Sequence, residues 1–118
     1  MYDQVIYCGD KGKVYAATDD MLYSCYDLGA DGAIAAILTL YPKECVQMWD
    51  CVQKGDMQTA KKLQDEMYPV WQAVVGEQFP RRIKAALELA GRKPGLPRSP
   101  ILPATQVEKE QIKAAMKI

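Results

Sequence analysis

The chain has 118 residues, and its 15 lysines and arginines balance 15 aspartates and glutamates, so the formal net charge is zero. This balance argues against binding to nucleic acid or to an anionic membrane, since both need an excess of basic residues. No apolar run approaches the roughly 20 residues that span a bilayer, and the start, Met-Tyr-Asp-Gln, lacks a signal-peptide pattern. We therefore expect a cytoplasmic protein with neither nucleic-acid nor membrane partners.

The first elements predicted along the chain are a helix and a βαβ unit. Residues 2–9 are predicted to be the end of a helix. Residues 13–17 (KVYAA) and 32–38 (GAIAAIL) are short apolar runs without alternation, which is typical of parallel strands buried on both faces. Residues 21–28 lie between them and place apolar side chains at helical spacing. A strand, a helix and a parallel strand in this order form a right-handed crossover.

Two helices are predicted directly after the second strand. Residues 43–54 carry apolar side chains on one side, and Gly55 ends the run. Asp56 is a suitable N-cap for the next helix, whose apolar stripe runs through Pro69 to Val74. Because proline lacks the amide N–H that a helix interior needs, we expect a kink in the turn before it.

Two further helices are predicted in the last third of the chain. Pro80 begins one of them, and Thr105-x-x-Glu108 is a capping box for the other. Between them, prolines recur at every third position from Pro94 to Pro103, which is typical of a polyproline II segment. This segment is either an extended strap over the helices or a ligand for an SH3-type domain.

Several large or charged side chains in the helices are assigned structural roles. Trp49 and Trp71 are predicted to anchor helix packing rather than to stack on a ligand. The basic pairs at 61–62 and 81–82 are predicted to be solvated faces, because a neutral chain offers no nucleic-acid patch.

The four cysteines are predicted to be free thiols with a packing role. Cys8, Cys25, Cys45 and Cys51 show no C-x-x-C spacing, and the chain contains no histidine. The pattern therefore favours neither a zinc site nor a Cys-His nucleophile pair. We expect no metal and no cofactor.

Polar residues follow the first predicted strand at its carboxyl end. Thr18, Asp19 and Asp20 precede the following helix and face its positive end. One interpretation is that Thr18 or Asp19 caps this helix. The other is that the acidic pair faces a substrate at the mouth of a parallel sheet or barrel.

These residues also carry a resemblance to a known family. A-T-D-D (17–20) and G-A-D-G-A-I (29–34), followed by Y-P-K-E-C (41–45), K-G-D (54–56) and P-R-S-P-I-L-P (97–103), occur here in one order. Together they resemble the dihydrodipicolinate synthase/N-acetylneuraminate lyase family, and the likeness covers essentially the whole chain. The family consists of (β/α)8-barrel class I aldolases and lyases.

The resemblance implies that the chain is the last two-fifths of such an enzyme. The first predicted strand would then be the seventh of the barrel and the second the eighth. The family's Schiff-base lysine lies on the sixth strand, so we expect no catalytic residue in this chain and no activity of the chain alone.

The resemblance also implies which residues border the substrate in the longer protein. They are the last residue of the first strand, the three residues that follow it and two positions on the second strand: Ala17, Thr18, Asp19, Asp20, Ile34 and Ala36. Ala17 replaces the glycine usual in the family, and Ala36 replaces a serine of the lyases. These departures leave open which small 2-oxo acid is the substrate.

The predicted fold class is α/β, with two parallel strands of a (β/α)8 barrel in residues 1–42 and a helical C-terminal subdomain in residues 43–118. The first functional hypothesis is the C-terminal part of a Schiff-base-forming aldolase or lyase that acts on pyruvate or another 2-oxo acid. The second is a non-enzymatic helical module. Two strands cannot close a barrel, so we expect the remainder of the barrel or a second copy of the chain as partner.

Overall fold

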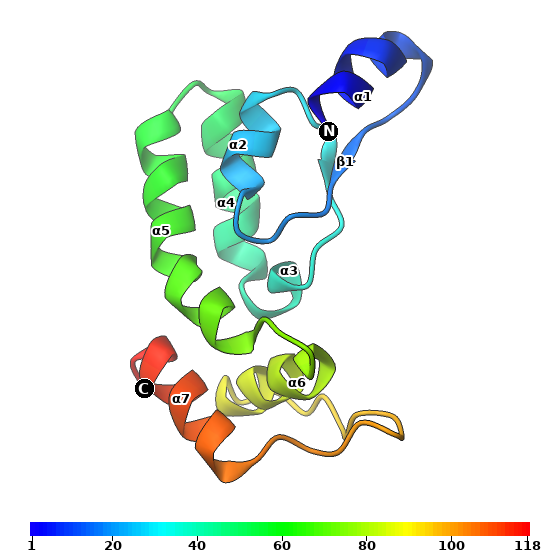
Figure 1. Cartoon of the computed structure of the whole chain (residues 1–118). Helices are drawn as coiled ribbons and strands as arrows, with labels where there is room; N and C mark the ends of the chain where they lie inside the picture. Colours follow the sequence, from blue (N-terminus) through cyan, green and yellow to red (C-terminus); the bar gives the residue numbers. More distant parts are fainter. The chain divides into compact units, whose positions relative to one another are not determined.

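The computed structural model describes residues 1–118 and divides into two compact units, residues 1–67 and 68–118. The protein is rich in helix and contains a single pair of parallel strands. No helix is both long enough and apolar enough to traverse a bilayer. Figure 1 shows the order of the elements along the chain.

The first unit contains the βαβ unit and the helices that pack on it. Its elements are α1 (Tyr2–Cys8), the 3₁₀ turn η1 (Gly9–Lys11), β1 (Tyr15–Ala16), α2 (Leu22–Asp27), β2 (Gly32–Ala33), α3 (Ile37–Leu40), α4 (Pro42–Gln53) and the first part of α5 (Met57–Val74). The order helix, strand, helix, strand was predicted from the sequence, and it is confirmed.

The two strands pair in parallel, as predicted, but they are much shorter than predicted. Tyr15 lies opposite Gly32 and Ala16 opposite Ala33. A side chain at Gly32 would meet the Tyr15 ring at 3.0 Å, so only glycine fits there without a shift. Each strand has one neighbour and an open outer edge, and the extended pairing stops after two residues.

The predicted strand ends and two-sided burial are therefore wrong for this chain. Residues 37 and 38 are not strand, because α3 begins at Ile37. Ile34 is 74% exposed and Tyr15 is 53% exposed. A parallel strand is buried on both faces only where further strands and helices cover it, and this sheet has no third strand.

Local sequence signals explain where α4 and α5 begin and end. Pro42 occupies the first turn of α4, where its missing N–H costs nothing. Gly55 follows α4 with a positive φ of 81°, a conformation that glycine adopts without strain. The Thr59 N–H donates to Asp56 Oδ1 at 3.1 Å, so Asp56 caps α5 as predicted. The helix continues through Pro69.

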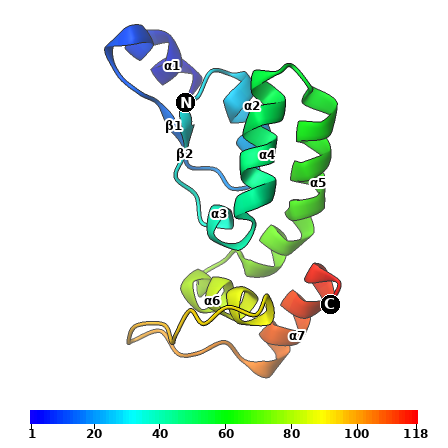
Figure 2. The same cartoon turned by 180° about the vertical axis from the view of Figure 1, so that it is seen from behind.

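The core of the first unit lies between α2, α3, α4 and α5. Leu22, Ile37 and Met48 are fully buried there, and both views show α4 beside α5 (Figures 1 and 2). The Tyr26 ring meets the Trp49 ring edge-on, with centroids 4.9 Å apart. Trp49 is thus a packing anchor, as predicted.

The division into units differs from the domain boundary predicted after residue 42. Helix α4 packs against both α2 and α3, so residues 43–67 belong to the same compact unit as the strands. The predicted boundary followed the change from strands to helices along the chain, and as a division of the longer protein it stays a prediction.

The second unit consists of the end of α5, α6 (Phe79–Leu89), an extended segment and α7 (Gln106–Met116). Thr105 and Glu108 form the predicted capping box: the Glu108 N–H donates to Thr105 Oγ1, and the Thr105 N–H donates to Glu108 Oε2. The Lys84 ammonium donates to the Pro94 carbonyl oxygen at 2.8 Å, so the proline segment is tied to α6.

Arg81 and Arg82 are not a solvated face, and that prediction is wrong. Both guanidinium groups donate to the same carboxylate oxygen of Glu108, at distances of 2.8 to 3.2 Å. Glu108 is buried, and burial alone would raise the pKa of its carboxyl. The hydrogen bonds from Arg81, the Thr105 backbone and Arg82 outweigh burial and lower this pKa to about 2.

Candidate functional site

The sheet register brings the predicted site residues to one edge of the strand pair. The Ile34 N–H donates to the Ala16 carbonyl oxygen at 2.8 Å. The segments that follow β1 and β2, residues 17–20 and 34–36, therefore leave the sheet side by side at its carboxyl end. Helix α3 begins at this end, and α1 lies toward the amino ends of the strands (Figure 1).

The Asp19 side chain connects the two segments. Its Oδ2 atom accepts a hydrogen bond of 2.7 Å from the Ile37 N–H, the first amide of α3. Asp19 is 8% exposed, and the first amides of a helix have no partner within the helix. The carboxylate of Asp19 thus caps a helix that begins 18 residues later and fixes the spacing between the two site segments.

The capping interpretation made from the sequence named the wrong helix. Neither Thr18 nor Asp19 accepts a hydrogen bond from the first turn of α2. Thr18 Oγ1 instead lies 3.5 Å from the Cys25 sulfur, and Asp19 caps α3. Sequence proximity favoured α2, whereas the parallel pairing of the strands brings Asp19 to α3.

The other predicted site residues differ in what they offer a ligand. Ala17, Thr18 and Ile34 are exposed, and Ala36 is half-buried. Asp20 is half-buried too, and its carboxylate takes part in no hydrogen bond or ion pair. Of the acidic pair, therefore, Asp19 is already engaged within the protein, and Asp20 has its hydrogen-bonding capacity available.

Sequence reasoning missed one residue that shapes this site, Gln64. It lies on α5, is 4% exposed, and bonds to the turn between Asp19 and Tyr23. A signal was present, because Gln64 stands four residues after Ala60 and three before Met67, on the apolar side of the helix. A buried glutamine in such a stripe needs polar partners.

Two buried side chains of the first unit, Cys45 and Tyr26, have pKa values raised above the ordinary range. All four cysteines are free, as predicted. Burial raises the pKa of the Cys45 thiol to about 12, with smaller contributions from Glu44 and Asp19. Burial likewise raises the pKa of the Tyr26 hydroxyl to about 12. No group of three or more cysteine, aspartate or glutamate side chains is placed to hold a metal ion.

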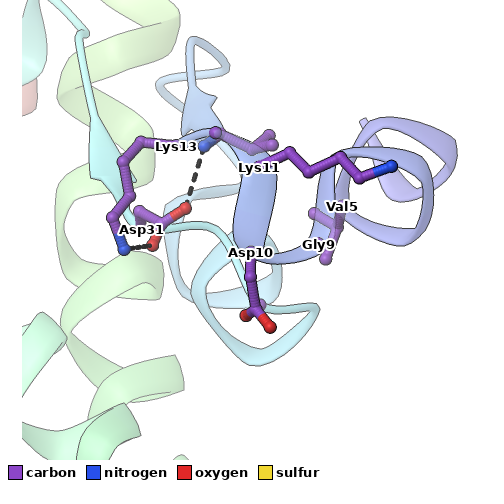
Figure 3. A pocket seen from close by; sticks show the side chains of 9 residues that line it. Val5, Gly9, Asp10, Lys11, Lys13 and Asp31 are labelled. Atoms are coloured by element: carbon purple, nitrogen blue, oxygen red, sulfur yellow. Dashed lines mark hydrogen bonds and ion pairs between the residues drawn. The ribbon is translucent and has the colours of Figure 1, made fainter.

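A cavity of about 440 Å³ lies at the opposite end of the strands (Figure 3). Its lining includes Val5 of α1, residues 9–14, Gly29 and Asp31. Asp31, just before β2, connects to the residues just before β1. Its carboxylate accepts hydrogen bonds from the Lys13 ammonium and from the Val14 N–H, each at 2.9 Å. None of the predicted site residues lines this cavity.

Comparison with known proteins decides the family. The sequence profile of the dihydrodipicolinate synthetase family matches residues 1–118. The chain belongs to this family. It is 31% identical over 103 residues to 4-hydroxy-tetrahydrodipicolinate synthase of Exiguobacterium sp., a match that covers 87% of this chain and 35% of the relative. It is 32% identical over 110 residues to the Prochlorococcus marinus (strain MIT 9301) synthase, with 93% and 37% covered.

The fold agrees with this assignment. A crystal structure of a dihydrodipicolinate synthase from Bacillus anthracis superimposes with a TM-score of 0.90 at 25% identity, and the match covers 99% of this chain and 40% of that one. The resemblance expected from the sequence is confirmed. The chain spans little more than a third of the length of the curated relatives that it matches.

Proposed function

We propose that this chain is the C-terminal part of a Schiff-base-forming aldolase or lyase that acts on pyruvate or another 2-oxo acid. In such chemistry a lysine amine attacks the carbonyl carbon and the carbonyl oxygen leaves as water. The resulting iminium withdraws electrons while a bond to the neighbouring carbon forms or breaks. The family match over residues 1–118 carries this proposal. In the proposed longer protein the two strands continue a (β/α)8 barrel, and the protein is cytoplasmic.

The carboxyl ends of the strands are the proposed substrate side of the chain. In parallel barrels the reacting groups stand at that end of the strands. Ala17, Thr18, Asp20, Ile34 and Ala36 border the substrate in this proposal. Asp19 is the remaining predicted residue. In this proposal it does not border the substrate but holds the two segments together through its hydrogen bond to Ile37.

The chain by itself is proposed to be inactive, because none of its eleven lysines suits the reaction. A Schiff-base lysine needs a pKa lowered toward neutrality, usually by burial. No lysine lies on β1 or β2. Lys13 is nearest to a strand, but a hydrogen bond to Asp31 and the charge of Asp31 raise its pKa, and it stands at the amino end of β1.

Borohydride trapping tests this proposal. The 118-residue chain and a longer protein that contains it are each incubated with pyruvate and sodium borohydride, and intact masses are measured. We expect a reduced pyruvate adduct on the longer protein alone, at a lysine outside these 118 residues. An adduct on one of the chain's own lysines would contradict the assignment of inactivity, and no adduct on the longer protein would contradict the reaction class.

The open edges of the strand pair support a second candidate function, assembly with a partner. Ile34 and Tyr15 are largely exposed, and on α1 so are Ile6 and Tyr7. Both outer edges of the sheet also lack a neighbouring strand, and such edges tend to pair with another chain. The partner is the remainder of the barrel or a second copy of this chain.

Sedimentation combined with amide hydrogen exchange tests the assembly proposal. We expect the isolated chain to dimerise through residues 13–38, or to exchange these amides rapidly. A monomer at micromolar concentration whose residues 13–38 stay strongly protected would contradict it. In a complex with the remaining barrel, the same residues should become protected.

A further inference from the structure

Gln64 makes three hydrogen bonds to the turn that carries the acidic pair. Its Oε1 atom accepts from the Leu22 N–H at 2.9 Å and from the Tyr23 N–H at 3.4 Å. Its Nε2 atom donates to the Asp19 carbonyl oxygen at 3.2 Å. The amide of one buried side chain thus spans the turn from Asp19 to Tyr23 from a position more than 40 residues later in the chain.

These bonds replace the cap that α2 lacks. The first amides of a helix find no carbonyl partner within it, and Met21, which precedes α2, offers no side-chain acceptor. Gln64 supplies that acceptor to Leu22 and Tyr23. The position of the turn therefore depends on α5 as well as on the sheet.

Asp20 lies inside this turn, between two fixed points. Asp19 is held twice, through its carboxylate by Ile37 and through its carbonyl oxygen by Gln64. Leu22 is held by Gln64 as well. The backbone on both sides of Asp20 is therefore restrained, while the Asp20 carboxylate itself takes part in no interaction within the protein.

We propose that Gln64 is a positioning residue for the substrate-bordering segment 17–20. It fixes the backbone on both sides of Asp20 at the carboxyl end of the strands and does not itself touch the substrate, because it is buried beneath the turn. The inference rests on the proposed function, which makes this segment part of the substrate site. It assigns a role in the site to α5, a helix outside the βαβ unit.

Amide exchange in a longer protein that contains this chain tests the structural half of the inference. Gln64→Met keeps the length of the side chain and removes both polar atoms, whereas Gln58→Met makes the same change at an exposed position of α5 and is the matched control. We expect the Leu22 and Tyr23 amides to exchange on the order of tenfold faster in Gln64→Met than in Gln58→Met, since each loses its acceptor. Amides of α4 should be unaffected.

A uniform rise in exchange across the first unit would overturn this positioning role, because it would indicate general destabilisation. Unchanged exchange at Leu22 and Tyr23 would overturn it too. If Gln64→Met does not fold, Gln64→Asn is measured instead. It keeps the amide but shortens its reach by one methylene, and we expect the same local increase.

Kinetics of a longer protein that contains this chain test the functional half. We expect Gln64→Met to lower kcat/KM for the 2-oxo acid reaction about tenfold, mainly through KM, and Gln58→Met to leave it unchanged. The double variant Gln64→Met/Asp20→Asn should lose no more than Asp20→Asn alone, because Gln64 acts through Asp20. Fully additive losses in the double variant would overturn the inference that Gln64 acts through Asp20.

The two halves separate the possible failures. Faster exchange at Leu22 and Tyr23 with unchanged kinetics would mean that the turn is positioned by Gln64 but does not border the substrate, which contradicts the proposed site. Unchanged exchange with an active, pyruvate-trapping longer protein would overturn the role of Gln64 alone and leave the proposed function standing.

Discussion

Asp19 and Asp20 are neighbours in the sequence, but their substitutions should have opposite consequences. Asp19→Ala removes the acceptor of the buried Ile37 N–H, 2.7 Å from the carboxylate. Leaving a buried donor unsatisfied costs about 1–3 kcal/mol, so we expect the free energy of unfolding to fall by about 2 kcal/mol. Asp20→Ala removes no interaction within the protein, and we expect a change within about 0.5 kcal/mol.

Urea unfolding of a longer protein that contains this chain, followed by circular dichroism, measures both values. Asp19→Asn serves as an intermediate case, because its amide oxygen can still accept from Ile37 without the negative charge, and we expect a loss of about 1 kcal/mol. The dependence on urea concentration should stay the same in all variants, since none changes the buried surface much. Equal losses for Asp19→Ala and Asp20→Ala would refute the assignment of Asp19 as the cap of α3.

In turnover by the longer protein the order of effects should reverse. Asp20→Asn is expected to impair turnover with little loss of stability, because the Asp20 carboxylate is free to meet a polar substrate. Asp19→Asn is expected to impair turnover only to the extent that it loosens the contact with Ile37. Steady-state kinetics beside melting temperatures would separate the two, and a variant of Asp20 with normal kinetics would remove this residue from the site.

Two further predictions concern titration and reactivity. The pKa of the Glu108 carboxyl is lowered to about 2 from an ordinary 4.5. The ionised carboxylate therefore stabilises the fold above about pH 4.5, and this stabilisation is lost as the pH falls toward 2. By linkage it amounts to at most about 3 kcal/mol. Glu108→Gln should therefore lower the free energy of unfolding at pH 7 by about 2 kcal/mol and flatten its dependence on pH below 4.5. A variant whose stability falls with acid as in the wild type would contradict the pairing of Arg81 and Arg82 with Glu108. Cys45 is buried, with a pKa of about 12, so iodoacetamide at pH 8 should label the half-buried Cys8 and Cys51 before Cys45. Early mass-spectrometric labelling of Cys45 in the folded chain would contradict its place in the core.

The sequence alone determined those features that depend on neighbours along the chain. The capping box of Thr105 and Glu108 closes over three residues, and Asp56 caps α5 over the same separation. Pro42 and Gly55 bound α4 through their own backbone preferences. Short motifs in sequence order also predicted the order of strands and helices and the family. The parallel pairing followed from that order, because a strand, a helix and a second strand form a right-handed crossover.

The strand lengths could not be predicted from those motifs. The apolar run at 32–38 is suited to a strand buried on both faces, but burial depends on how many neighbours the sheet has. With one neighbour, the strand stops at Ala33, Ile34 is exposed and α3 begins at Ile37. The run is apolar throughout, but this sheet has only two strands and so cannot cover both of its faces.

Only the tertiary structure decided which polar groups meet at the site. Asp19 reaches an amide 18 residues away, and Gln64 reaches the turn around Asp20 from more than 40 residues away. Arg81 and Arg82 find Glu108 on another helix in the same way. The residue types in the sequence show which groups are able to form hydrogen bonds, but a bond requires two atoms within about 3 Å of each other. For residues this far apart along the chain, that distance is set by how the strands pair and the helices pack.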